Sequence, residues 1–202
     1  MRSASDTLQL IAERLRENIE VKRAILANDE LLKLIYEVAV ACIHALESGG
    51  KIILFGNGGS AADAQHIAAE LVGRYLRNRR ALGAIALTTN TSSLTAIGND
   101  YSFERLFSRQ IEAIGNRGDL AIGISTSGNS ENVLRALTAA KEKGMVAVGL
   151  TGSSGGKLRD ETNYCLCIPS EQTPRIQEAH IAVGHILCEI IEEHFSHEQN
   201  IS

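Results

Sequence analysis

The chain has 202 residues, the size of one α/β domain, and its 20 Lys and Arg against 24 Asp and Glu give a formal charge of −4 at pH 7. This balance leaves no basic excess for a nucleic-acid backbone, and no apolar run reaches the roughly 20 residues that cross a bilayer. Two prolines and 44% hydrophobic residues exclude disorder of the whole chain. We therefore expect a cytoplasmic protein without nucleic-acid or membrane partners.

Two helices are predicted before the first strand, because apolar residues recur at helical spacing over residues 5–27 and 29–47. In the first helix these residues are Leu8, Ile11, Leu15, Ile19 and Leu26. Gly49 and Gly50 then end the second helix, as glycine commonly does at a helix C-terminus.

From residue 51 the pattern alternates between strands and helices. Short apolar runs predict strands at 51–55, 82–88, 119–124, 145–150 and 164–168, and helical spacing predicts helices near 60–77, 92–114, 130–143 and 174–195, with a short helix before the last strand. This order is typical of a parallel sheet with helices on both faces, which binds ligands outside the carboxyl ends of its strands. We expect one domain over residues 1–202, with a helical part at 1–48 and an α/β core at 49–197.

Four cysteines, Cys42, Cys165, Cys167 and Cys188, are too few and too scattered for a disulfide framework, so reduced thiols are expected. Cys165 and Cys167 lie two residues apart in a predicted strand and therefore point to one face. A zinc site there would need at least two more ligands at metal spacing, and we do not favour it.

The loop after the first strand, Gly56 to Ala61, fits the G-x-G-x-x-A dinucleotide fingerprint. We reject a nicotinamide or flavin enzyme, because the second strand ends at 86–90 without the acidic residue that would hold the ribose. The stretch 149–157 is not a Walker motif either, since Leu158 follows Gly156 and Lys157.

A second loop, residues 125–130, reads Ser-Thr-Ser-Gly-Asn-Ser and precedes a predicted helix. Four hydroxyls and several backbone N–H groups beside a helix N-terminus are suited to a phosphate. The alternative is a capping loop in which Asn129 or Ser130 only satisfies the helix N-terminus. Because one cap needs one hydroxyl and this loop has four, we favour phosphate binding.

Two helices carry polar side chains among apolar ones. His66 and Glu70 are four residues apart and share one helix face, which is usually a surface pair or a buried hydrogen bond. In the last helix, Gln177 and His185 lie roughly on one side and could meet His66 and Glu70 across an interface. His180 could equally be a core histidine with a satisfied partner.

These motifs together resemble the phosphoheptose isomerases of the sugar isomerase (SIS) domain superfamily. The resemblance covers nearly the whole chain and rests on residues 55–60, 65–75, 98–100, 123–130 and 175–185. It implies a flavodoxin-like fold with a five-stranded parallel sheet. It also implies a homotetramer in which the N-terminal helices serve oligomerisation and each active site is completed by a neighbouring subunit.

The resemblance further implies an aldose–ketose isomerase. Its members interconvert D-sedoheptulose 7-phosphate and D-glycero-D-manno-heptose 7-phosphate, the first step of bacterial ADP- or GDP-heptose synthesis for lipopolysaccharide or other surface glycans. An enediol intermediate is expected, since a proton must move between adjacent carbons.

Site residues are implied by the same motifs. Glu70 corresponds to the general base and His185 to the acid, and one Zn²⁺ per subunit is expected on His66, Glu70, Gln177 and His185. The substrate-binding set is Asn57, Gly58, Gly59, Ser60, Glu70, Asn99, Asp100, Ser125, Thr126, Ser127, Ser130 and Gln177. Within it, 125–127 and 130 would hold the phosphate, helped by 57–60, and 99–100 would contact sugar hydroxyls.

Two features depart from the motif or extend it. Pro174 stands where some members carry an acidic residue, and Arg74 lies in a basic cluster that is usually a solvated face or a subunit contact.

Two other functions stay open. Some SIS relatives are non-catalytic adaptors that bind the replication initiator or sense sugar phosphates, but these lack the equivalents of Glu70 and His185. An isomerase of another sugar phosphate would share the phosphate loop.

Overall fold

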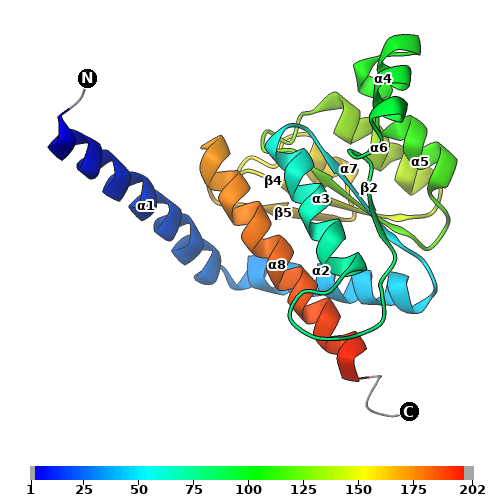
Figure 1. The fold of residues 1–202 in the computed structure, drawn as a ribbon, viewed down its shortest axis with the longest axis horizontal. Helices are drawn as coiled ribbons and strands as arrows, with labels where there is room; N and C mark the ends of the chain where they lie inside the picture. Colours follow the sequence, from blue (N-terminus) through cyan, green and yellow to red (C-terminus); the bar gives the residue numbers. More distant parts are fainter. Residues whose placement is uncertain (1–2, 198–202) are drawn as a thin grey trace.

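The structure, a computed structural model, describes residues 3–197. At its centre lies a parallel sheet in the order β2-β1-β3-β4-β5, with helices on both faces (Figure 1). The strands are β1 (Ile52–Gly56), β2 (Ala84–Ala86), β3 (Leu120–Ile124), β4 (Val146–Thr151) and β5 (Tyr164–Cys167). This is the doubly wound, flavodoxin-like order that the sequence predicts, and the direction of winding changes between β1 and β3.

Two apolar layers hold the helices to the sheet. One face packs against α2 (Asp29–Glu47), α3 (Gly59–Val72) and α8 (Thr173–His197), through residues such as Val38, Ile67 and Val183. The other face packs against α5 (Ser108–Ile114), α6 (Glu131–Glu142) and α7 (Leu158–Glu161), with Ile111 and Leu137 at its centre. Strands β1 and β3 are buried on both faces, which explains their unbroken apolar sequences.

The predicted boundaries are wrong in two places. The helix expected at 60–77 ends at Val72, and the strand expected at 82–88 shrinks to three residues, because residues 73–83 form a separate loop. The helical stretches predicted at 92–114 are confirmed as α4 (Thr91–Asp100), a 3₁₀ turn (Phe103–Arg105) and α5, which are separated where the chain leaves helical geometry at Tyr101.

Helix α1 (Ala4–Leu26) projects from the body of the molecule (Figure 1). None of its residues is buried, and its apolar stripe is open: Leu8 is 67% exposed, Leu15 61% and Leu26 71%. Its second half is attached to the body, where Val21 and Ile25 pack against the core and Asn18 Nδ2 donates to Glu178 Oε2 of α8 at 2.5 Å. No helix among residues 3–197 combines the length and the apolar composition that a membrane span requires.

His180 is a core histidine, as one of the two interpretations of the sequence had it. Its side chain is fully buried and its Nε2 lies 3.1 Å from the carbonyl oxygen of Thr151. Because a carbonyl only accepts, the ring carries its proton on Nε2. Burial lowers the pKa of His180 to about 4, and the hydrogen bond to Thr151 opposes this only in part.

The lowered pKa of His180 predicts that the folded protein loses stability in acid. A folded-state pKa below the unfolded value of ~6.5 contributes stability that is complete above pH 6.5 and is lost as the pH falls toward the folded value. Between pH 7 and pH 5 we expect His180 to lower the free energy of unfolding by about 2 kcal/mol. Urea denaturation at pH 7 and at pH 5 measures this change in the free energy of unfolding. His180→Gln, which keeps a donor for Thr151, should show a smaller loss, and an equal loss would contradict the assignment.

Candidate active site

The close approach of α3 and α8 builds the site. The two helices run side by side in the same direction, because Gly59 lies against Gln177 at their beginnings and Ile67 against Gly184 further along. A Cβ on Gly184 would stand 2.6 Å from Ile67 Cδ1 and 2.8 Å from Ile67 Cγ1, so a larger residue there would force the Ile67 side chain to shift. Residues of α3 and α8 at the same height therefore face each other.

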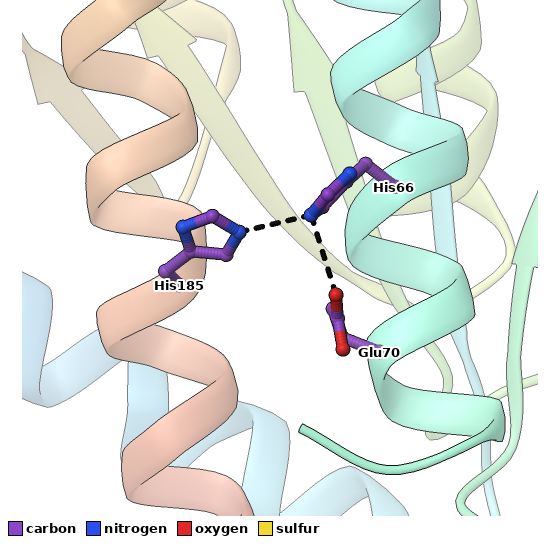
Figure 2. Close-up of side chains that lie close together, drawn as sticks. All are labelled: His66, Glu70 and His185. Atoms are coloured by element: carbon purple, nitrogen blue, oxygen red, sulfur yellow. Dashed lines mark hydrogen bonds and ion pairs between the residues drawn. The ribbon is translucent and has the colours of Figure 1, made fainter. Parts of the chain in front are cut away.

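His66, Glu70 and His185 meet at this contact (Figure 2). His66 Nε2 lies 2.9 Å from His185 Nε2 and 3.3 Å from Glu70 Oε1. His66 is half exposed and Glu70 is 24% exposed, so the cluster opens to solvent. The expected meeting of His185 with His66 and Glu70 therefore takes place within one chain.

The His66 cluster, defined by these three residues, has the donor set of a metal site. Two imidazole nitrogens and a carboxylate oxygen are ligands that zinc prefers, and one such atom of each residue lies within 4.8 Å of the others. The fourth expected ligand, Gln177, is placed differently. It lies eight residues from His185, a rise of about 12 Å along the helix, and its side-chain amide abuts Gly59.

Sequence analysis missed a layer of side chains around the cluster. The ring of Tyr75 stacks on His185 with centroids 5.4 Å apart and an interplanar angle of 20°. Tyr75 belongs to the loop 73–83, which we call the arginine loop after Arg74, Arg77, Arg79 and Arg80. The only signal for this layer was a carboxylate, Glu192, in the apolar stripe of the last helix.

Glu192 ties the arginine loop to α8. Its buried carboxylate accepts hydrogen bonds from the backbone N–H groups of Tyr75 (2.7 Å), Leu76 (2.5 Å) and Arg77 (2.8 Å). Burial alone would raise the pKa of Glu192, but these three bonds and the Arg79 guanidinium more than offset it and lower the pKa. Arg79, whose side chain is fully buried, donates to the carbonyl of Glu70 at 2.7 Å.

The loop 125–130, here called the serine loop, precedes α6. Ser125 Oγ lies 2.9 Å from Ser130 Oγ and 3.5 Å from Ser127 Oγ, so three hydroxyls gather at one point. Ser130 occupies the N-cap position but makes no capping hydrogen bond, and Asn129 directs its side chain to Ser127 and Lys157. The capping interpretation is therefore wrong.

A second uncapped helix start lies beside the first. Helix α3 begins after Gly58, which has a φ of 55° and no side chain to cap with. Asn57 and Asn132 exchange two hydrogen bonds of 2.9 Å and so join the glycine loop (residues 56–60) to the first turn of α6. Because β1 and β3 are neighbours, both helix N-termini lie at the point where the winding reverses, the usual ligand site of such sheets.

The serine loop is held from behind by the segment 152–157. Gly128 has a φ of 68°, and a Cβ there would stand 2.1 Å from the carbonyl oxygen of Gly155. Lys157 N donates to Asn129 Oδ1 at 3.1 Å, and Leu158 N to Gly128 O at 3.1 Å. Backbone contacts thus fix the loop without any ligand.

Asn99 and Asp100 stand at the C-terminal end of α4. They are exposed, and Asn99 Nδ2 donates to Asp100 Oδ1 at 2.8 Å. Within residues 3–197 they make no hydrogen bond or ion pair to the His66 cluster or to the serine loop. Their expected contact with the sugar stays a prediction.

Comparison with known proteins agrees with this architecture. The SIS domain family model matches residues 5–152. The phosphoheptose isomerase of Aneurinibacillus thermoaerophilus is 57% identical over 183 residues, which cover 91% of this chain and 92% of that protein. The one from a Nitratiruptor species is 58% identical over 167 residues, 83% of this chain and 89% of that one. The chain belongs to the phosphoheptose isomerase family. It is a sugar-phosphate isomerase.

A solved structure supports the same assignment. The phosphoheptose isomerase GmhA from Neisseria gonorrhoeae is 43% identical and superposes with a TM-score of 0.87, covering 93% of this isomerase and 99% of that chain. The five-stranded parallel sheet and its covering helices are therefore those of the SIS fold.

The carboxylate of Glu192 should control the opening of the arginine loop. Glu192→Gln removes a charge from three hydrogen bonds, and we expect a loss of about 2 kcal/mol. Four arginines make this loop a trypsin substrate when it opens, so native-state cleavage within 73–83 should accelerate about 30-fold. The neighbouring variant Glu193→Gln is the matched control, because Glu193 is exposed and pairs with Arg77 only at 3.5 Å.

The effect should also depend on pH. The folded-state pKa of Glu192 is lowered, so its contribution is present above the unfolded value of ~4.5 and disappears as the pH falls through the folded one. The difference between wild type and Glu192→Gln should shrink on acidification. Equal cleavage of both Gln variants at pH 7 would contradict the role of Glu192.

Proposed function

We propose that this isomerase converts D-sedoheptulose 7-phosphate into D-glycero-D-manno-heptose 7-phosphate, the first step of bacterial ADP- or GDP-heptose synthesis for lipopolysaccharide or another surface glycan. The observation that carries the proposal is the convergence of Glu70 and His185 from two helices. The names of the relatives supply the substrate class.

The reaction needs a base at carbon and an acid at oxygen. Glu70 takes the proton from the carbon next to the carbonyl, and His185 delivers a proton to the carbonyl oxygen, which gives an enediol. His66 lies between them, at 2.9 Å from His185 Nε2 and 3.3 Å from Glu70 Oε1. One of the two imidazoles donates to the other, so the tautomers of His66 and His185 are coupled.

The phosphate end of the substrate is assigned to the serine loop. Ser125, Thr126, Ser127 and Ser130 offer hydroxyls, and the N-terminus of α6 offers backbone N–H groups that no side chain caps. The glycine loop, residues 57–60, adds the N-terminus of α3. An anion between two helix N-termini is stabilised by both.

A zinc ion fits the donor set of the His66 cluster. His66, Glu70 and His185 would hold it, whereas Gln177, the fourth ligand that the family resemblance implies, lies beside Gly59 in this chain. When bound, zinc would polarise the substrate carbonyl as a Lewis acid. A carboxylate that ligates a metal through one oxygen keeps the other for a proton, so Glu70 can combine both roles only if one oxygen stays free.

We also propose that the protein works as a homotetramer assembled through α1. Exposed Leu8, Ile11, Leu15 and Ile19 form an apolar stripe that this chain leaves open. Asn99 and Asp100 make no hydrogen bond or ion pair to the site within residues 3–197, and a neighbouring subunit would bring such a pair to it.

Replacing the base tests the chemistry. Glu70→Gln keeps the size of the side chain and should lower kcat for sedoheptulose 7-phosphate by about 10²–10⁴-fold, while calorimetry shows sugar-phosphate binding largely retained. Glu189→Gln, an exposed carboxylate on α8, is the control and should keep wild-type turnover. Normal turnover of Glu70→Gln would refute the base.

Incubation with and without a chelator tests the metal and the substrate together. We expect aldoheptose phosphate as the product and a rate that falls when the protein is stripped of metal and returns with Zn²⁺. No aldoheptose phosphate in either condition would overturn the proposed substrate and favour the non-catalytic adaptor. An unchanged rate after stripping would overturn the zinc assignment alone.

The assembly has its own test. Leu15→Glu with Ile19→Lys places charges on the apolar stripe and should convert the tetramer to smaller species in sedimentation velocity. Glu13→Lys, on another face of the same helix, should leave the tetramer intact. A tetramer in the double variant would show that α1 does not assemble it.

A further inference from the structure

Strand β5 carries two thiols on one face. Its side chains alternate, so that Leu166 packs into the layer of α2 and α8 while Cys165 and Cys167 point to the layer of α6 and α7. The two Sγ atoms lie 3.7 Å apart, and both side chains are half-buried rather than enclosed. The proposed isomerase mechanism uses neither of them.

An exposed arginine contacts one of the two thiols. Arg159 of α7 is exposed, and its Nη2 donates to Cys167 Sγ at 3.6 Å and to the carbonyl of Ser153 at 3.4 Å. Within the described part of the chain no cation donates to Cys165, which instead lies next to Thr162, Leu158 and Gly149. The two thiols therefore have different surroundings.

These contacts give the thiols opposite acidities. The hydrogen bond from Cys165, followed by Arg159, lowers the pKa of Cys167 from 9.0 to about 6, although its partial burial opposes this. The same bond and burial raise the pKa of Cys165. Burial also raises the pKa values of Cys42 and Cys188 to about 12. Among the four thiols, Cys167 is therefore the one whose surroundings, including the Arg159 guanidinium at 3.6 Å, favour the thiolate.

We propose that Cys165 and Cys167 form a peroxide-sensitive dithiol, in which Cys167 reacts first and Cys165 closes a reversible disulfide. The Cys167 thiolate attacks one oxygen of a hydroperoxide, the O–O bond breaks, and the product is a sulfenic acid with hydroxide or alkoxide as the leaving group. Cys165 then loses its proton and attacks the Cys167 sulfur, and water leaves as the S–S bond forms. Two thiols are oxidised and one peroxide is reduced.

The bond requires β5 to bend. Alternate residues of a strand are about 6.6 Å apart at Cα and, because their side chains are parallel, also at Cβ, whereas the Cβ atoms of a disulfide are about 3.8 Å apart. The sulfurs must close from 3.7 Å to about 2.05 Å. Within the described sheet β5 pairs only with β4, so one of its edges is free to adjust. A bond that bends the strand is strained, so common thiols should reduce it readily.

Mass spectrometry tests the proposal on the native, full-length protein. Trypsin releases residues 160–175 as one peptide that contains both cysteines. After brief hydrogen peroxide treatment this peptide should lose the mass of two hydrogens and regain it with dithiothreitol. Cys42 and Cys188 serve as internal controls and should stay unmodified. Stepwise oxygen addition to Cys167, with no loss of hydrogen, would overturn the dithiol.

Single substitutions assign the two roles. In Cys165→Ser the sulfenic acid of Cys167 cannot be resolved, so dimedone should label it, whereas in Cys167→Ser dimedone should leave Cys165 unlabelled. Equal labelling of the two variants would overturn the order of attack.

A third test needs no cysteine substitution and so cannot be confused by a loss of folding. It compares wild type with a variant of the exposed Arg159. The iodoacetamide reaction of Cys167 should rise with pH and level off above about pH 6, whereas an ordinary thiol gains rate up to about pH 8.5. In Arg159→Met the midpoint should move upward, and the rate at pH 7 should fall several-fold. A wild-type midpoint near pH 8.5 would contradict the thiolate.

Discussion

The site depends on the close approach of α3 and α8 beside Gly184, whose missing side chain leaves room for Ile67. A Cβ at 184 would stand 2.6 Å from Ile67 Cδ1, so a larger residue there would displace the Ile67 side chain. At this approach the Nε2 atoms of His66 and His185 lie only 2.9 Å apart. The same two helices bring Gln177 against Gly59, and Glu192 of α8 holds the arginine loop that follows α3.

The sequence was informative where local spacing decides the structure. The parallel sheet with helices on both faces followed from the alternation of strands and helices, and the shared face of His66 and Glu70 followed from their separation of four residues. The flavodoxin-like fold came from the family resemblance. The distance between Gln177 and His185 along α8 was not considered in predicting that both meet His66 and Glu70. Gln177 and His185 share a side of α8, yet the rise between them places Gln177 beside Gly59. Spacing predicts which face a residue occupies better than which neighbour it meets.

Other features were out of reach of the sequence because they depend on distant contacts. Nothing local indicates that Glu192 accepts from three amides more than a hundred residues earlier, or that Tyr75 stacks on His185. The loop at 73–83 explains the errors in the helix and the strand that flank it. Its backbone is satisfied by Glu192 rather than by regular structure. The partners of the four hydroxyls in the serine loop were equally hidden.

Glu192 and His185 lie on one continuous helix, seven residues apart, which is close to two full turns. His185 and Glu192, which holds the loop of Tyr75, therefore keep a fixed orientation relative to each other along the helix. An insertion or deletion of one residue between them would rotate one relative to the other by about 100°. A change of length in this part of α8 would therefore separate His185 from the loop whose tyrosine stacks on it.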